Sequence, residues 1–105
     1  MNIAELENNA ERAAELLGAM ANPRRLMVLC KLLEGEKSVN TLADSVGLSQ
    51  SALSQHLAKL REKGLVSTRR DAQTIYYGLA SEEVRGILST LYGLYCEPDI
   101  LRAKA

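Results

Sequence analysis

Tryptophan and phenylalanine are absent from the 105 residues, and there are only four Tyr, so a hydrophobic core must be built from aliphatic side chains. Long apolar runs are absent as well. No stretch approaches the roughly 20 residues that cross a bilayer, and Met1–Glu15 is too polar for a signal peptide. We therefore expect a cytoplasmic protein with no membrane partner. The length suits one small domain, residues 1–105, which would be marginal as a monomer and so favours an oligomer.

Histidine and cysteine are scarce, which limits the available chemistry. The single His56 and the two cysteines, Cys30 and Cys96, supply too few nitrogen and sulfur ligands for a closed zinc site. There is no Cys-x-x-Cys and no βαβ pattern around either thiol, so a thiol–disulfide exchange enzyme is not indicated. We expect no enzyme activity, no metal and no cofactor. In a reducing compartment, two distant cysteines do not by default form a stabilising disulfide.

Net charge is also lacking, because 13 basic residues balance 13 acidic ones. The distribution is uneven. Residues 49–75 hold five basic and two acidic residues, a balance of +3, whereas the remainder holds eight basic and eleven acidic residues, a balance of −3. A basic segment on an acidic body favours binding of a polyanion in one orientation.

Apolar spacing and capping residues predict three helices in the first half of the chain. Residues 2–20 read as one helix with an apolar stripe. Asn22 caps a second helix, with Pro23 at its first position, that runs to about Glu34. A turn at 34–37 precedes a third helix at 39–46. The inner side of the second helix is predicted to carry Leu26, Leu29, Cys30 and Leu33.

The fourth predicted helix, residues 48–63, has an unusual outer surface. Ser49 caps it, Gly64 ends it, and three leucines share its inward face. The outward face begins with amides and hydroxyls, which suit hydrogen bonding to base edges, where a helix that only needed solubility would show Glu and Lys. A solvated polar face is the alternative for this helix taken alone. The outward residues are Gln50, Ser51, Ser54 and Gln55, followed by Lys59 and Arg61.

Gly47 separates the third helix from the fourth, which is typical of a helix-turn-helix, here residues 38–63. The runs 65–70 and 74–79 are rich in β-formers and flank a short turn at 71–73, so they predict an antiparallel hairpin over 65–79. A basic hairpin directly after such a helix is a wing. Its Arg69, Arg70 and Gln73 can reach phosphates or a minor groove. An ordinary surface hairpin is the alternative.

Ser81 caps a last helix that runs to about Tyr95, and Pro98 prevents its continuation. The end helices, residues 1–20 and 81–96, have wider apolar stripes than a small winged core requires. Their mutual burial in a two-fold dimer would place two reading helices about 34–36 Å apart, one turn of DNA. The predicted fold is mostly α with a β-hairpin wing. It has four helices, two strands and a final helix, in a homodimeric winged helix-turn-helix.

Three stretches together resemble the ArsR/SmtB family of winged-helix transcriptional repressors. They are residues 17–33 (LGAMANPRRLMVLCKLL), 49–60 (SQSALSQHLAKL) and 64–77 (GLVSTRRDAQTIYY). The resemblance covers essentially the whole chain. It implies a homodimer that holds a palindromic operator in double-stranded DNA and releases it when an inducer binds. The DNA-binding residues would be Gln50, Ser51, Ser54, Gln55, His56 and Lys59 on the reading helix, and Arg69, Arg70 and Gln73 in the wing.

The resemblance also bears on the inducer, because the family is divided by its sensing sites. Its thiolate metal sensors carry a Cys-x-x-Cys-like cluster in the third helix, and its zinc sensors use Asp and His pairs on the last helix. This chain has neither pattern. Cys30 and Cys96 instead resemble the sulfide-responsive subgroup, in which persulfides or oxidants bridge two thiols of one subunit by a disulfide or polysulfide and DNA is released. The resemblance thus implies a reactive sulfur species or an oxidant as inducer.

Local chemistry activates neither thiol. Cys96 lies at a helix C-terminus beside Glu97, and Cys30 has Glu34 one turn later and no basic residue three or four positions away. Two alternatives within the family therefore remain: cysteines that serve only as small hydrophobes, or a thiophilic metal or metalloid as inducer. A winged-helix module that binds proteins is the alternative of a different class.

Overall fold

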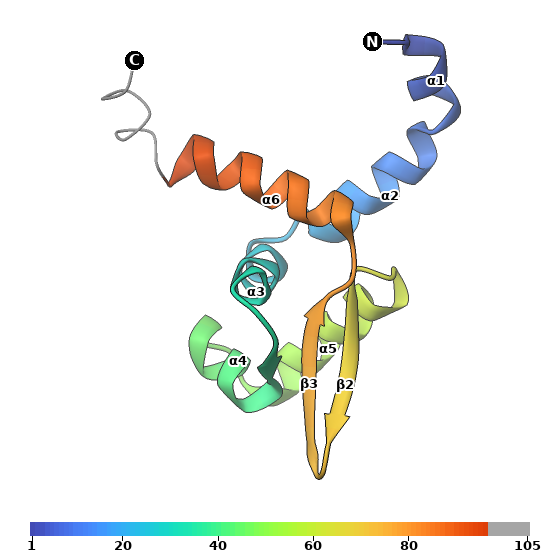
Figure 1. Cartoon of the computed structure of the whole chain (residues 1–105). Coiled ribbons are helices and arrows are strands. Elements are labelled where there is room, and N and C mark those ends of the chain that lie inside the picture. The colour runs from blue at the N-terminus through green and yellow to red at the C-terminus, as the bar shows by residue number, and fades with distance from the viewer. Residues whose placement is uncertain (97–105) are drawn as a thin grey trace.

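The computed structural model describes residues 1–96. Figure 1 shows α2 and α6 across one end of the molecule, with α3, α4 and α5 below them and the β2–β3 hairpin projecting away. The sheet is antiparallel with strand order β1-β3-β2. Pro98 and Glu97, used in the sequence predictions, lie outside the described residues. In chain order the elements are α1 (Ile3–Asn8), α2 (Ala10–Met20), α3 (Pro23–Leu33), β1 (Lys37–Ser38), α4 (Val39–Val46), α5 (Gln50–Glu62), β2 (Val66–Asp71), β3 (Thr74–Leu79) and α6 (Glu82–Tyr95).

The predicted helix-turn-helix is confirmed as α4 and α5. Gly47 ends α4 in the left-handed conformation, with φ of 70°. The Ser49 hydroxyl then caps α5 by accepting a hydrogen bond from the Ala52 N–H at 3.1 Å. From α3, the Arg24 guanidinium donates to the Val46 carbonyl at 3.2 Å. The turn between the two helices is therefore held by its own caps and by a neighbouring helix.

The core is aliphatic, as the lack of Trp and Phe predicts. The inward leucines of α5 belong to one core cluster with apolar side chains from α3, α4 and α6. From β3, the partly buried side chains of Tyr77 and Leu79 pack against this cluster. Burial of one face of α5 leaves its polar face toward solvent. The largest fully buried side chains are Val28, Leu29, Leu32, Leu42, Leu53, Leu57, Leu60, Val84 and Leu88.

The prediction of one helix over residues 2–20 is wrong, because the segment is divided at Asn9. Asn9 has φ of −110° and ψ of 8°, and its side-chain amide donates to the Glu5 carbonyl at 2.9 Å. This side chain competes with the helical backbone for hydrogen bonds, which apolar spacing does not register. The first of the two helices, α1, buries no residue within this chain.

The prediction of a simple turn at 34–37 is also incomplete. Lys37 and Ser38 form β1, which pairs with Tyr77 and Tyr76 of β3 and adds a third strand to the hairpin. A two-residue strand is too short to produce a recognisable alternation of polar and apolar residues. The hairpin itself is confirmed, with a turn shortened to Ala72 and Gln73.

Cys30 is exposed, so its predicted place on the inner side of α3 is wrong. Leu29 is buried as predicted. The other buried residues of α3 are Val28 and Leu32, so the buried face is turned relative to the predicted one. Apolar residues occupy nearly the whole circumference of α3, so spacing alone could not select the buried face.

Helix α6 has its predicted bounds, with Ser81 as its cap. The apolar stripes of the end helices are exposed within the single chain, as the dimer prediction requires. On α6, Tyr95 is 77% exposed, and on α1 Ile3 is 56% exposed. The other large apolar side chains exposed on α1, α2 and α6 are Leu6, Leu17, Tyr92 and Leu94.

Replacing Gly64 by Ala should lower the free energy of unfolding by about 1–2 kcal/mol, because Gly64 has φ of +76° and an L-residue is strained there. It ends α5 with two hydrogen bonds, from the Leu65 N–H to the Leu60 carbonyl at 2.9 Å and from the Gly64 N–H to the Arg61 carbonyl at 3.0 Å. Urea unfolding measures the change.

The matched control is Gly18→Ala inside α2, where a Cβ meets no atom within 4 Å and no positive φ applies. Alanine should raise stability there by about 0.5–1 kcal/mol. A loss of stability at Gly18 as large as at Gly64 would contradict the assignment of the Gly64 effect to backbone conformation.

Candidate functional site

The predicted DNA-reading residues form one continuous outward surface on α5. His56 differs from the rest because it is half-buried, at the edge of the leucine face. The capped N-terminus and the buried leucines hold this surface in place, so its amides and hydroxyls are presented by a rigid helix. The exposed members are Gln50, Ser51, Ser54, Gln55 and Lys59.

A contact between the two helices orders the start of this surface. The Gln50 side-chain amide donates a hydrogen bond to the Asn40 side-chain carbonyl, which lies near the start of α4. The sequence predictions did not include Asn40, because a polar residue on the outside of a short helix carries no pattern. The contact places Asn40 of α4 beside the predicted base-reading surface.

The structure separates the two wing arginines that the sequence treated alike. Neighbouring residues of a strand point to opposite faces, so Arg69 and Arg70 lie on opposite sides of the hairpin. Arg69 pairs in register with Tyr76, and its guanidinium lies 4.9 Å from the centroid of that ring. Its Nε donates to a Glu36 carboxylate oxygen at 3.1 Å. Within residues 1–96, Arg70 makes no ion pair, and Gln73 is exposed in the turn.

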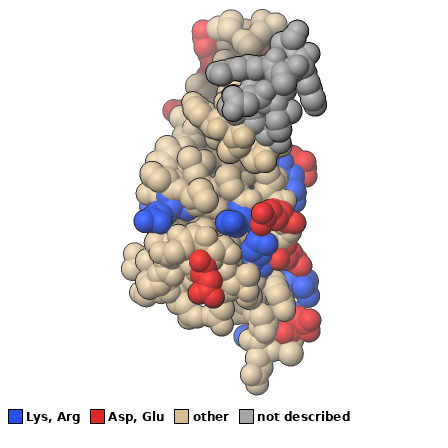
Figure 2. All heavy atoms as spheres, turned by 90° about the vertical axis from the view of Figure 1, so that its left-hand side faces the viewer, with Lys and Arg blue, Asp and Glu red and all other residues tan. Residues whose placement is uncertain are grey.

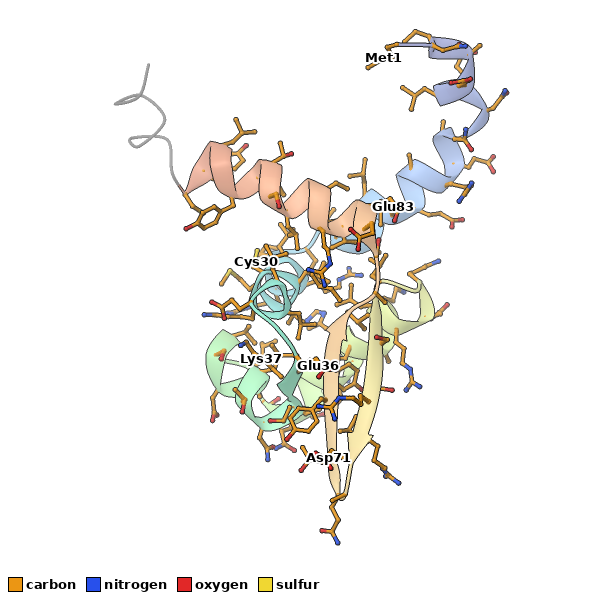
Figure 3. The ribbon with its side chains drawn as sticks, in the orientation of Figure 1. Met1, Cys30, Glu36, Lys37, Asp71 and Glu83 are labelled. Carbon is orange, nitrogen blue, oxygen red and sulfur yellow. The ribbon has the colours of Figure 1, made fainter. Side chains whose placement is uncertain are left out.

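The two cysteines, far apart in the sequence, line one groove between α3 and α6 with a volume of ≈ 420 Å³. Figure 3 shows Cys30 on α3 beneath α6. Both thiols are free and exposed. The structure therefore brings together the two predicted sensing residues, on the outer side of α3 rather than in the core. The rest of the groove is lined by Met27, Lys31, Leu33, Glu34, Leu88 and Tyr92.

Partial burial raises the pKa of the Cys30 thiol above its ordinary value, the charge of a nearby Cys96 thiolate raises it further, and Lys31 lowers it. The effect of Cys96 on this pKa follows from the position of both thiols in one groove. Lys31 was missed by the sequence reasoning, which examined only residues one helical turn from Cys30. At neutral pH Cys30 is held as the thiol, with one basic residue available to stabilise its anion.

Other kinds of site find little support in the described part of the chain. Across residues 1–96, no three His, Cys, Asp or Glu side chains gather into a metal-binding group. None of the described helices is both long enough and apolar enough to cross a membrane. On the face shown in Figure 2, basic and acidic side chains are interspersed, so this face is not uniformly basic.

A helix-turn-helix followed by a β-hairpin wing, with a polar outer face on its second helix, defines the class of winged helix-turn-helix DNA-binding regulators. Comparison with known proteins identifies the family. The model described as "Bacterial regulatory protein, arsR family" matches residues 22–68. The transcriptional activator HlyU of Vibrio cholerae is 55% identical over 99 residues, 94% of this chain and 92% of HlyU. This chain belongs to the ArsR family.

Further relatives agree in sequence and in structure. The nodulation protein NolR of Rhizobium meliloti is 58% identical over 91 residues, 87% of this chain and 75% of NolR. The structure of reduced HlyU from Vibrio cholerae matches with a TM-score of 0.83, covering 88% of this chain and 97% of that one. HlyU and YgaV of Escherichia coli, which is 47% identical over 96 residues, are named as transcriptional regulators rather than enzymes, in agreement with the prediction.

Two other solved structures extend the comparison. The transcriptional repressor BigR from Xylella fastidiosa is 40% identical, with a TM-score of 0.87 over 91% of this chain and 98% of that one. The DNA-binding domain of Mb0332 from Mycobacterium bovis, described as homodimeric, is 31% identical, with a TM-score of 0.76 over 87% of this chain and 84% of that one. The predicted winged-helix fold is therefore confirmed.

The charge interactions at Cys30 predict a specific pH dependence of its reactivity. Because the thiolate is the nucleophile, a raised pKa shifts the alkylation of Cys30 to higher pH than in the urea-unfolded chain. Cys96→Ser should shift the profile to lower pH by removing a negative neighbour, and Lys31→Ala should shift it to higher pH. Iodoacetamide kinetics at several pH values, read by peptide mass, measure this. Profiles that both variants leave unmoved would contradict the proximity of the three groups.

Proposed function

We propose that this chain is a homodimeric, cytoplasmic transcriptional repressor that releases its operator when Cys30 and Cys96 become bridged by sulfur. The observation that carries the proposal is the shared groove, because two free, exposed thiols that are 66 residues apart in the sequence both line it. Thiols that served only as small hydrophobes would be expected in the core instead.

The bridging chemistry balances with a low-molecular-weight persulfide, RSSH, as the oxidant. One cysteine thiolate attacks the outer sulfur of RSSH, which gives a cysteine persulfide and releases RSH. The second thiolate attacks the inner sulfur of that persulfide, which forms the Cys30–Cys96 disulfide and releases sulfide. If both cysteines are first converted to persulfides, loss of one sulfide leaves a trisulfide. In each route the pair of cysteines is oxidised by two electrons in total, and one persulfide-derived sulfur is reduced to sulfide; in the trisulfide route the second added sulfur stays in the bridge.

The position of the groove explains how a bridge can affect DNA binding. On one side, α3 packs against α4, α5 and β3, which carry the reading surface, and on the other it contacts α6. A covalent link between Cys30 and Cys96 ties α6 to α3, and through α3 to the reading head, which is the unit formed by α4, α5 and the wing. If α6 belongs to the dimer interface, the link changes how the two reading heads are set relative to each other, a population shift driven by a bond.

The dimer is supported by the uncovered apolar surface and by the homodimeric relative. Large apolar side chains on α1, α2 and α6 are exposed in the single chain. Burying them across a two-fold axis removes that surface from water. The interface then uses residues 1–20 and 81–96, and two reading helices separated by about 34–36 Å match a palindromic operator.

We assign DNA contact to residues 38–63 and to the wing, residues 65–79. The amides and hydroxyls of α5 suit base edges in the major groove, and the wing arginines suit phosphates. The residues proposed to contact DNA are Gln50, Ser51, Ser54, Gln55, His56 and Lys59 on α5, and Arg69, Arg70 and Gln73 in the wing.

Base reading and phosphate binding are separable by a pair of variants. Gln55→Ala should cost about 1–3 kcal/mol on the operator and relax the preference at one base position. Arg70→Ala should weaken operator and random DNA equally and reduce the slope of log affinity against log salt by about one. Fluorescence anisotropy over a salt series measures both. Equal losses on both duplexes for Gln55→Ala would overturn its assignment to base reading.

The sensing proposal is tested on the anaerobically reduced protein. Glutathione persulfide should abolish operator binding, together with a mass change that links Cys30 to Cys96. Cys96→Ser should bind the operator as wild type does and keep binding it after treatment. Anisotropy and intact mass are recorded on the same sample. Release of DNA by treated Cys96→Ser protein would contradict the dithiol mechanism.

The same experiment separates the alternatives. Wild-type protein that stays bound after treatment would make the cysteines non-sensory. Release by peroxide but not by persulfide would make an oxidant the inducer, and release by a thiophilic metalloid alone would favour that ligand. A winged helix that recognises proteins would show no steeply salt-dependent binding to DNA.

A further inference from the structure

An ion pair spans the solvent-facing side of the three-stranded sheet. Glu36 directly precedes β1, Arg69 lies on β2, and β3 runs between these two strands. Arg69 Nε donates to both Glu36 carboxylate oxygens, at 3.1 Å to Oε1 and 3.3 Å to Oε2. Figure 3 shows Glu36 beside the hairpin. The carboxylate thus reaches across the central strand to hold the wing arginine.

The central strand accommodates this contact at two positions on the same face. At Gly78, an added Cβ would lie 3.3 Å from the Glu36 Cγ, so any larger residue would press on the Glu36 side chain. Two residues earlier, the Tyr76 ring lies under the Arg69 guanidinium. Gly78 thus leaves space for the Glu36 side chain, and the Tyr76 ring supports the Arg69 guanidinium. Together they give the ion pair a defined geometry, although both of its side chains are about half exposed.

We propose that Glu36 competes with DNA phosphates for Arg69 and so lowers the affinity of the wing for DNA of any sequence. The inference rests on the proposed DNA-binding function. An arginine binds carboxylate and phosphate with the same planar set of donors, so a phosphate must displace Glu36 or share the guanidinium with it. Because phosphates carry no sequence information, the effect is equal on operator and random DNA.

The test is Glu36→Gln, which removes the charge and keeps the shape. Anisotropy with reduced protein should show tighter binding to operator and random duplex by the same factor. One additional free phosphate contact steepens the slope of log affinity against log salt by about 0.9. The gain over wild type should therefore shrink about threefold when salt is raised from about 50 to about 200 mM.

Three further variants separate competition for Arg69 from a general change of charge. Glu34→Gln makes the same charge change two residues earlier, on an acid that pairs with Lys37 at 3.4 Å, and should leave the salt slope unchanged. Adding Arg69→Ala to Glu36→Gln should remove the gain. Gly78→Ala makes the Glu36 Cγ shift by a few tenths of an ångström without altering any charge, so it should change binding to both duplexes much less than Glu36→Gln does. Thermal unfolding of each variant checks that the fold is retained.

Each outcome has a distinct meaning. A gain that is matched by Glu34→Gln, or that survives in the Glu36→Gln/Arg69→Ala protein, overturns competition for Arg69. A folded Glu36→Gln protein that binds both duplexes with wild-type affinity would also overturn competition for Arg69. Wild-type protein that binds neither duplex in a salt-dependent way contradicts the proposed DNA-binding function instead.

Discussion

The packing of α3 is the constraint on which the rest of the structure depends. Its buried residues, among them Leu29 and Leu32, join the leucine face of α5 and the core residues of α4 and α6 in one cluster. The same helix presents Cys30 on its outer side, in the groove shared with α6. One rigid element therefore contacts both the reading head and the thiol groove. A change in the groove cannot shift α3 without disturbing close-packed contacts to the reading head.

The reading surface and the wing are organised by different forces. On α5, burial of three leucines and a serine cap orient a polar face that needs no charged partner. In the wing, charge decides the arrangement, because the Glu36 carboxylate neutralises Arg69 while Arg70 lies on the opposite face of the hairpin. If the wing binds phosphates as proposed, its capacity is less than its count of arginines suggests, because an acidic residue outside the hairpin occupies Arg69.

The thiol groove shows how an exposed thiol can have a raised pKa. Partial burial and a neighbouring thiolate raise the pKa of Cys30, whereas Lys31 is the one basic residue that lowers it. A thiol held protonated resists indiscriminate oxidation, and a soft, strongly electrophilic sulfur donor remains able to capture its small thiolate fraction. This balance suits the proposed sensing role, in which the thiols stay reduced until a specific reactant appears.

The sequence by itself determined the helix-turn-helix, the caps at Ser49 and Ser81, the end of α5 at Gly64 and the β2–β3 hairpin. These features depend on interactions within a few residues, which spacing and residue type reveal directly. Only the tertiary structure decided that Cys30 faces outward, that it lines one groove with Cys96, and that Glu36 holds Arg69. The two-residue strand β1 belongs with these. Each of them depends on contacts between distant segments, and the spacing of residues along a chain does not encode which of several apolar faces or charged groups will be brought together.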